Sequence, residues 1–478
     1  MSEKHVLSKS TFIRGTQCLK SLYLNKKRPF LRDRLSDEQR AIFKRGTDVG
    51  VLAQDLFRGG IDLKPKSPSQ YRKKVDETKA VIQSGSHSVI YEAAFQSDGL
   101  LILLDILVKD QNEWVAYEVK SSLKVSETFL TDAAFQYYVM HHSGLVVKDF
   151  YLITLNPEYQ FKDKLDINRL FLKHQVTDEV LQRQEWIEKQ IIAEKETLLL
   201  DHSPVIPIGP QCNAPYPCDF QRHCWKKVSD NSVLYLDAFS EDFRFKAFYS
   251  GNDAPEKIEP EFCTRQQQIQ LQSARSKSLF TDEKKLAHFA AAIPREVNFS
   301  TVLFVRPAVP CFEGTKPYQR IPIAMASEKE TKIFITQDNP MEAFADYLKK
   351  QWEQNVPFAV YDAGDCSQFL QENHYDSLLE ALPDHLIDLK EVFDSGMLYH
   401  YQLKGNYQKR QIAKVLLNKW IRALNPALLK MEWQKTLFNQ AVVQDELISQ
   451  THEYLQQSNQ FLHDFLALIQ HGLSEGEN

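Results

Sequence analysis

"LLILLDILVKDQNEWVAYEVKSS", residues 100–122, contains two runs rich in large apolar and β-branched residues, separated by the turn-like "KDQN". Together with "SVIYEAAF" from Ser88, these runs predict three consecutive strands of one sheet. "DAAFQYYVMHH" from Asp132 then has a helical pattern, and "DFYLITLN" from Asp149 predicts a further buried strand. This order of strands, helix and strand predicts an α/β core.

The predicted strands carry three charged residues that need an explanation. Asp105 lies inside an apolar strand, where an ionised carboxylate is costly unless it is paired or bound to a metal. Side chains alternate along a strand, so Glu118 and Lys120 project to one face and Val119 projects to the other. Two carboxylates suit Mg²⁺ or Mn²⁺, and the matching chemistry is phosphodiester hydrolysis, in which Lys120 holds a water or stabilises the transition state.

A structural explanation is also open, because Glu-Val-Lys is common on half-exposed strands and Asp105 could cap a turn. Nevertheless, "LLDILVKDQNEWVAYEVKSS" followed by "DAAFQYYV" resembles the motifs of the RecB-like branch of the PD-(D/E)xK nucleases. The resemblance implies a restriction-endonuclease-like core, with Asp105 and Glu118 as metal ligands and Lys120 as the catalytic lysine. It also implies the carbonyl of Val119 as a third ligand and Glu92 as a supporting acid.

Two parts of this family pattern are altered here. In "GVLAQDLF", Gln54 stands where the family has histidine; its amide could still contact a metal, or it could be a solvated helix residue. Gln136, with Tyr137 or Tyr138, fills the catalytic helical motif, although Met140 stands where the strict motif requires tyrosine.

Three cysteines lie close together in "QCNAPYPCDFQRHCW", and a fourth precedes the nuclease motifs in "RGTQCLKSLYL". The five-residue gaps between these cysteines disfavour a zinc site but do not exclude one in which His223 is a ligand. A second alternative is that the cysteines are buried free thiols. One cysteine before the motifs and three after them resemble the iron–sulfur staple of RecB-like nucleases. That resemblance implies a [4Fe–4S] cluster acting as a structural clip. Its ligands would be Cys18, Cys212, Cys218 and Cys224.

Charge is unevenly distributed along the chain. The net charge is −5, so any affinity for nucleic acid must come from local patches. Residues 1–50 hold twelve Lys or Arg against five Asp or Glu, which favours contact with phosphates there. Near the cysteines, the candidate DNA-binding residues are Lys20, Lys26, Lys27 and Arg28, with Tyr138 from the helical motif.

The chain length predicts more than one core. We expect a nuclease domain with its iron–sulfur cluster at 1–228, a bridging region at 229–296 and a second α/β domain at 297–478 that ends in a helical tail. Phrases such as "RPAVPCFEGTKPYQRIPIAMAS" and "VPFAVYDAGDCSQF" in the last part resemble a bacterial family of unknown function. That family joins an iron–sulfur RecB-like nuclease to a DnaQ-like exonuclease domain of the RNase H fold.

The acids that such an exonuclease needs for two metals are largely missing. Its first strand reads Thr301-Val302-Leu303 where Asp-x-Glu is expected, and Asp362 and Cys366 stand where Asn and Glu are expected. Asp388 remains. We therefore expect a catalytically inactive scaffold that binds nucleic acid or a partner, with a rearranged site of Asp362, Asp365 and Asp388 as the alternative.

Taken together, the sequence predicts a cytoplasmic Mg²⁺- or Mn²⁺-dependent deoxyribonuclease, with exonuclease action on single-stranded DNA or DNA ends in repair or defence. The alternative is a non-catalytic nucleic-acid-binding or scaffold subunit of a larger complex. No membrane span is expected, because the longest apolar run is far shorter than the roughly 20 residues required. No Gly-rich phosphate loop is present, so a helicase activity would come from a partner protein.

Overall fold

The structure is a computed structural model, and it divides the chain into two compact units. The first unit comprises residues 1–227 with 308–317, and the second comprises 228–307 with 318–478. The segment 229–296, for which a bridging region is predicted, thus belongs to the second unit. The structure describes residues 6–34, 48–336, 338–421 and 425–471.

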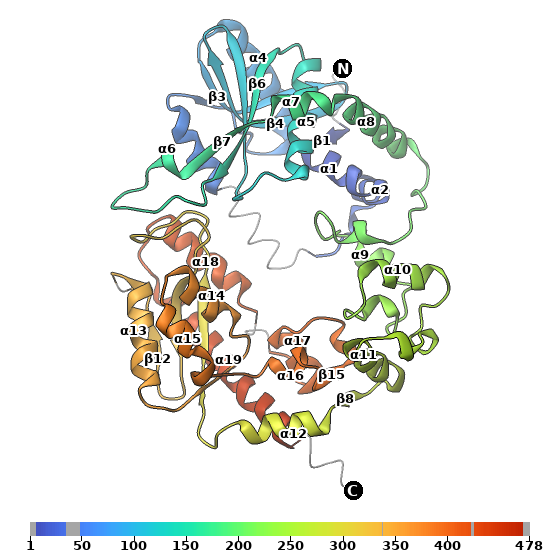
Figure 1. Ribbon diagram of the computed structural model, residues 1–478. Coiled ribbons are helices and arrows are strands. Elements are labelled where there is room, and N and C mark those ends of the chain that lie inside the picture. The colour runs from blue at the N-terminus through green and yellow to red at the C-terminus, as the bar shows by residue number, and fades with distance from the viewer. Residues whose placement is uncertain (1–5, 35–47, 337, 422–424, 472–478) are drawn as a thin grey trace. The chain divides into compact units, whose positions relative to one another are not determined.

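A seven-stranded sheet forms the centre of the first unit (Figure 1). The order is β2-β3-β4-β5-β6-β7, with β1 paired to β4. Pairing is antiparallel for β3–β4, β4–β5 and β6–β7, and parallel for β1–β4, β2–β3 and β5–β6. The strands are β1 (Leu7–Ser8), β2 (Ile61–Asp62), β3 (Val89–Ser97), β4 (Leu100–Asp110), β5 (Glu113–Val119), β6 (Val147–Leu155) and β7 (Phe171–Gln175).

Local sequence explains the central strands. Asp98 and Gly99 both have positive φ, at 47° and 73°, as a two-residue type I′ turn requires, so β3 and β4 form a tight hairpin. Most of the apolar residues of β4 are buried, and the sheet is covered on its buried face by α5. The predicted strands from Ser88, Leu100, Glu113 and Asp149 are confirmed, as is the mixed α/β architecture.

Helices pack on this sheet and on one another. α5 contacts β3, β4 and β6, and α7 and α8 pack against α5. The predicted helix from Asp132 begins earlier, at Glu127, where the Ser126 hydroxyl accepts the N–H of Phe129 at 3.4 Å. The helices and 3-10 turns are α1 (Lys9–Gln17), α2 (Leu19–Lys27), η1 (Pro29–Leu31), η2 (Gln54–Phe57), η3 (Pro68–Gln70), α4 (Tyr71–Ser84), α5 (Glu127–His142), α6 (Ile167–Leu170), α7 (Thr177–Gln182), α8 (Gln184–Leu199), η4 (Pro210–Cys212) and α9 (Gln221–Cys224).

α1 is held against α8 by close packing around a buried acid. A Cβ at Gly15 of α1 would overlap the carboxyl group of Glu194 on α8, so a larger residue at this position would require the Glu194 side chain to shift. Glu194 is fully buried, and both of its carboxyl oxygens are without a hydrogen-bond partner in the described structure. Burial raises the pKa of Glu194 from 4.5 to about 9. Glu194 is therefore neutral at physiological pH.

Glu194→Gln is expected to flatten the pH dependence of folding stability. Unfolded Glu194 ionises near pH 4.5, whereas folded Glu194 keeps its proton to about pH 9, so the free energy of unfolding falls as pH rises between these values. The fall has an upper limit of about 1.4 kcal/mol per pH unit, and the glutamine variant lacks it. Urea unfolding at mildly acidic and mildly alkaline pH measures the difference. Glu196→Gln, on an exposed position of the same helix, is the control; equal pH dependence in wild type and Glu194→Gln would contradict the prediction.

The second unit contains three small sheets. One is antiparallel with the order β10-β11-β12, one is parallel with the order β14-β13-β9, and β15 pairs with β8. β9 and β10 are separated by Ser300 alone, so one extended segment connects the antiparallel and the parallel sheets. The strands are β8 (Leu279–Thr281), β9 (Asn298–Phe299), β10 (Thr301–Val305), β11 (Ile321–Ala326), β12 (Thr331–Ile333), β13 (Phe358–Val360), β14 (Leu386–Asp388) and β15 (Leu398–His400).

The C-terminal part of the second unit is helical, as predicted. The long helix α19 buries one face, including Leu455, Phe461 and Phe465, against the core of this unit. None of the described helices has the length and hydrophobicity that crossing a bilayer requires. The helices and 3-10 turns are η5 (Val233–Tyr235), α10 (Glu241–Tyr249), η6 (Pro255–Lys257), η7 (Pro260–Phe262), α11 (Arg265–Ser276), α12 (Glu283–Ala292), α13 (Pro340–Trp352), α14 (Gly364–Glu372), α15 (Asp376–His385), α16 (Glu391–Asp394), η8 (Tyr401–Leu403), α17 (Lys409–Leu416), α18 (Ala427–Phe438) and α19 (Asp445–His471).

Candidate functional site

The two predicted metal ligands lie where β4 and β5 separate. The ladder between these strands runs from Asp110–Glu113 to Ile106–Tyr117, and the next opposing pair is Asp105 and Glu118. Instead of continuing the ladder, Asp105 Oδ2 accepts the N–H of Val119 at 2.7 Å. β5 meanwhile continues its parallel pairing with β6 through Val119. The end of the ladder therefore places two carboxylates side by side.

Glu92 lies in the same row, on the other side of Asp105. The β3–β4 register pairs Tyr91 with Ile106 and Ala93 with Leu104, which sets Glu92 opposite Asp105. Glu92 has φ of 53°, an unusual backbone conformation for a non-glycine residue in a strand and one that costs conformational energy. Its carboxylate forms an ion pair of 3.1 Å with Lys64. Three acids thus lie across three adjacent strands.

Two lysines converge on one oxygen of Glu118. Lys9, the first residue of α1, donates to Glu118 Oε1 at 2.6 Å, and Lys120 donates to the same oxygen at 2.8 Å. Lys120 also forms an ion pair with Asp132 of α5. Glu118 Oε2 is buried and has no hydrogen-bond partner in the described structure. The site therefore holds an unsatisfied carboxylate oxygen next to Asp105.

Burial and neighbouring charges separate the pKa values of the two acids. Burial, followed by the charge of Glu118, raises the pKa of Asp105 to about 7. Burial also acts to raise the pKa of Glu118, but Lys120 and Lys9 outweigh it and bring that pKa to about 2. For Lys9 and Lys120, burial acts to lower the pKa, but the surrounding carboxylates raise it above its usual range. Both ammonium groups are thus charged at neutral pH.

α5 adds further buried polar groups. Asp132 and Gln136 are four residues apart and so share a face of the helix. Asp132 Oδ1 and both amide atoms of Gln136 are buried without a hydrogen-bond partner in the described structure. Such groups cost free energy unless a ligand, ion or water satisfies them. Glu118 Oε2 is a further buried oxygen of this kind.

The remaining predicted residues of this site, Gln54 and Tyr138, come from η2 and α5. Gln54 begins η2, and its backbone carbonyl accepts the hydroxyl of Tyr91 at 3.4 Å, which places it beside the strand of Glu92. Tyr138 stacks on His142 with ring centroids 3.9 Å apart, and burial, followed by the charges of Glu188 and Asp98, raises its pKa. Asp98 is in the β3–β4 turn, whereas Asp105 is in the middle of β4.

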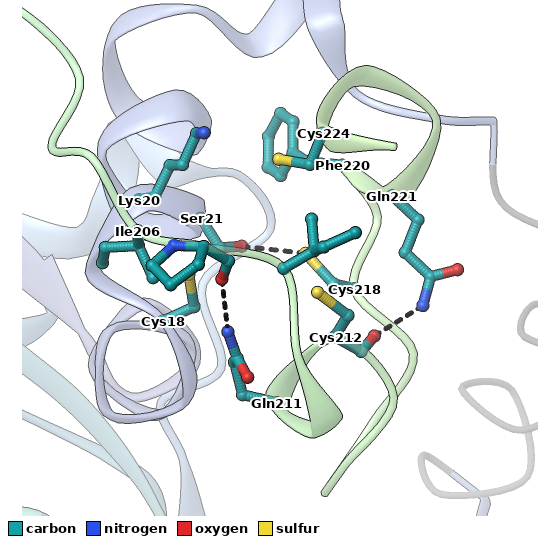
Figure 2. Close-up of a pocket in the computed structure, with 12 residues that line it drawn as sticks. Cys18, Lys20, Ser21, Ile206, Gln211, Cys212, Cys218, Phe220, Gln221 and Cys224 are labelled. Carbon is teal, nitrogen blue, oxygen red and sulfur yellow. Dashed lines mark hydrogen bonds between the residues drawn. The ribbon is translucent and has the colours of Figure 1, made fainter. Parts of the chain in front are cut away.

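The four cysteines of the predicted cluster line one pocket (Figure 2). The pocket holds about 350 Å³ of space, part of it open to solvent, and Lys20 also lines it. Burial raises the pKa of the Cys18 and Cys224 thiols, and their cysteine neighbours add to this rise. In the described part of the chain, no group of three or more His, Cys, Asp or Glu side chains has the geometry to hold a metal ion. The pocket is lined by Cys18, Cys212, Cys218 and Cys224, all of them free thiols.

Polar contacts join the N-terminal helices to the cysteine loop. Arg14 forms a two-point ion pair with Asp219, with Nη2 3.0 Å from Oδ2, and Arg32 contacts the same carboxylate at 2.8 Å. Gln17 donates to the carbonyls of Gln211 and Tyr216 at 2.7 and 2.6 Å. These contacts explain why Cys18 lies near three cysteines about 200 residues later in the chain.

Of the predicted basic residues, Lys20 lines this pocket. The charge of Lys20 lowers the pKa of Cys224, although burial has the larger and opposite effect. Lys20 and Arg28 also lie near enough to His223 to lower its pKa, after burial as the first cause. Lys26 and Lys27 end α2.

The acids of the second unit do not form an open cluster. Asp388 accepts backbone N–H groups from Asp362 and Ala363 at 2.9 and 2.8 Å. Asp362 pairs with Lys390 at 3.3 Å, and Asp365 pairs with Arg320 at 3.0 Å. Each carboxylate of the alternative rearranged site is thus engaged with donors of the protein.

Sequence reasoning missed Lys9, Lys64 and Asp132. Asp132 had a usable signal, because it lies one helical turn before Gln136. Lys9 had none, since 109 residues separate it from Glu118 and only the packing of α1 brings it there.

Comparison with models of protein families gives a match in the second half of the chain. A family model described as a domain of unknown function, DUF2779, matches residues 299–408, within the part of the chain that contains β10, β11 and β13. Among curated proteins, nothing matches the chain.

Proposed function

We propose that the first unit is a metal-dependent nuclease that hydrolyses phosphodiester bonds, as the RecB-like resemblance implies. The observation that carries this proposal is the pair Asp105 and Glu118 at the point where β4 and β5 separate, with Lys120 on Glu118. By resemblance, the substrate is single-stranded DNA or DNA ends, the action is exonucleolytic, and the context is DNA repair or defence.

Asp105 and Glu118 would hold Mg²⁺ or Mn²⁺, with the Val119 carbonyl as a third ligand. The metal would polarise a phosphate oxygen and acidify a water. Because its pKa is near 7, Asp105 can lose its proton when a cation binds. The Oε2 atom of Glu118, which has no hydrogen-bond partner in the described structure, can then bind the same cation. Lys120 is charged and directed at the same carboxylate, so it can stabilise negative charge on a phosphate there.

We further propose that Cys18, Cys212, Cys218 and Cys224 bind a [4Fe–4S] cluster. Their common pocket supports this, and thiolate ligation would fix α1 and α2 to the cysteine loop. Because α1 begins with Lys9, the same attachment would also steady one side of the nuclease site.

The second unit is proposed to be a degenerate RNase H-like domain. An antiparallel sheet, β10-β11-β12, and a parallel sheet, β14-β13-β9, connected through the extended segment of β9 and β10, are compatible with a degenerate form of that fold. Thr301, at a position where an acid is expected, has a buried hydroxyl with no hydrogen-bond partner in the described structure. Asp388 is held by backbone N–H groups and Asp365 by Arg320, so neither carboxylate is free to bind the two metal ions that an active exonuclease of this fold requires.

A second function, nucleic-acid binding without cleavage, has one observation in its favour. Lys9 and Lys120 already satisfy Glu118 Oε1, and two ammonium groups can neutralise an acidic site as a metal would. In this case Lys9 occupies the place of the cation.

Cleavage assays on end-labelled single- and double-stranded DNA with Mg²⁺ or Mn²⁺ separate the two functions. Glu118→Gln is expected to reduce cleavage at least about 100-fold, because the variant loses a metal ligand and the charge that positions both lysines. Glu113→Gln is the matched control: it lies on the same strand, is exposed, and pairs only with Lys148 at the surface. Binding without cleavage by the wild type in both metals would establish the second function instead.

A further inference from the structure

The second unit contains a long segment without acids. Residues 395–431 hold seven Lys or Arg and no Asp or Glu, in a chain whose net charge is −5. The segment includes η8, α17 and the start of α18. Its basic residues are Lys404, Lys409, Arg410, Lys414, Lys419, Arg422 and Lys430.

Ion pairs neutralise only two of the described cations of this segment. Lys404 pairs with Asp230 at 2.8 Å, and Lys419 pairs with Asp464 at 2.6 Å. Within the described ranges, no carboxylate lies within 4 Å of the remaining four. These are Lys409, Arg410, Lys414 and Lys430.

Lys409 of α17 and Lys430 of α18 are partly buried, and their positive charges repel one another. Burial, followed by the charge of Lys430, lowers the pKa of Lys409 to about 8. Burial also lowers the pKa of Lys430, and Arg320 and Arg306 add to this effect. Partly buried like charges without a counter-ion are unfavourable, and a bound anion relieves that cost.

The nearby acids are engaged with other groups. Asp362 and Asp388 act to raise the pKa of Lys409, but Asp388 is held by backbone N–H groups and Asp362 by Lys390. Asp365, which acts on Lys430, is held by Arg320. The positive charge of the two lysines is therefore incompletely compensated.

An exposed aromatic ring lies beside the other two cations. Trp420 is 66% exposed, unusually high for tryptophan. The guanidinium carbon of Arg410 and the Nζ of Lys414 lie 5.6 and 5.9 Å from the centre of its ring system. Proteins that bind single-stranded nucleic acids use exposed aromatic rings to stack on the bases and nearby cations to contact the phosphate backbone.

We propose that Lys409, Lys430, Arg410 and Lys414, with Trp420, form a binding site on the second unit for the phosphate backbone of single-stranded nucleic acid. The two partly buried lysines hold a phosphate group, and Trp420 stacks on a base. This site does not depend on cleavage by the first unit. Inorganic phosphate shares the anionic chemistry, so the test must separate it from a nucleic-acid strand.

Lysine footprinting tests the site directly in the full-length protein. At about pH 8, a low-pKa amine reacts readily with an acylating reagent, so Lys409 is expected to be labelled and then protected by saturating oligothymidylate without divalent metal. Lys404 and Lys419, ion-paired in the same segment, are internal controls whose labelling should not change. Protection by inorganic phosphate at the same phosphate concentration would overturn the nucleic-acid assignment, and absence of protection by both would overturn the site.

Affinity measurements provide a second readout. Fluorescence anisotropy of labelled oligothymidylate should show at least tenfold weaker binding for the double variant Lys409→Gln/Lys430→Gln. Its slope of log K against log salt should fall by about 1.4, since two phosphate contacts are lost at about 0.7 each. Lys409→Arg/Lys430→Arg should restore binding, and the control Lys404→Gln/Lys419→Gln should bind as the wild type. Unchanged affinity and slope in a folded glutamine variant would overturn the proposal.

Discussion

Lys120→Met is expected to lower the rate of DNA cleavage by about two to three orders of magnitude while the protein remains folded. Methionine keeps much of the volume of the side chain but removes the positive charge. Glu118 would then retain only Lys9, and Asp132 would lose its ion pair. Single-turnover cleavage of end-labelled DNA at saturating protein measures the chemical step, and anisotropy without divalent metal checks that binding persists.

Lys124→Met is the matched control for this experiment, since Lys124 is exposed and only four residues further along the chain. It should cleave like the wild type. Lys9→Met is informative as a third variant, because Lys9 touches the same oxygen of Glu118 from a different helix. If Lys120→Met cleaves at the wild-type rate, Lys120 is a structural partner of Asp132 and the nuclease proposal loses its catalytic lysine.

The strands of the first unit could be predicted because their information is local. The apolar run around Asp105 and the alternation of Glu118, Val119 and Lys120 are visible in a short window of sequence. They predict both the strands and the convergence of charge on one face. Helix boundaries were less well defined, because the N-cap at Ser126 precedes the apolar stretch on which the prediction rested.

The rest of the site depends on tertiary packing. Lys9 reaches Glu118 because α1 packs on α5 and α8, and the close approach of Gly15 to Glu194 within this packing has no pattern in the sequence. The positive φ of Glu92 likewise has no signal in the local sequence "IYEAA". Such strain is found where surrounding structure holds a residue in place.

In the second unit, too, some features can be read from the local sequence and others depend on tertiary packing. The absence of acids over residues 395–431 can be read directly from the sequence, and it was the missed signal there. What the sequence does not contain is which of those cations find partners. Asp230 and Asp464, which neutralise Lys404 and Lys419, lie far away in the chain. The residues left without partners are defined only by the fold.

Cys18→Ser is expected to have the largest effect on stability of any single substitution considered. If a [4Fe–4S] cluster joins Cys18 to the loop of Cys212, Cys218 and Cys224, loss of one ligand removes the cross-link of α1 and α2 to that loop. Structural metal sites contribute on the order of 10 kcal/mol to folding. The polar contacts of Arg14 and Gln17 would remain, but partly buried hydrogen bonds and ion pairs of that kind contribute only about 1–3 kcal/mol each.

The measurements are iron content and visible absorbance after anaerobic purification, followed by thermal unfolding. Cys18→Ser should lose the brown colour and most of its iron, and its unfolding temperature should fall by more than about 10 °C. Cys263→Ser is the control, because Cys263 belongs to the second unit and lies outside the pocket. If the wild-type protein contains zinc and no iron, the four cysteines form a zinc site and the proposed iron–sulfur cluster is wrong. Full iron content in Cys18→Ser would remove Cys18 from the ligand set and, with it, the proposed attachment of α1 beside Glu118.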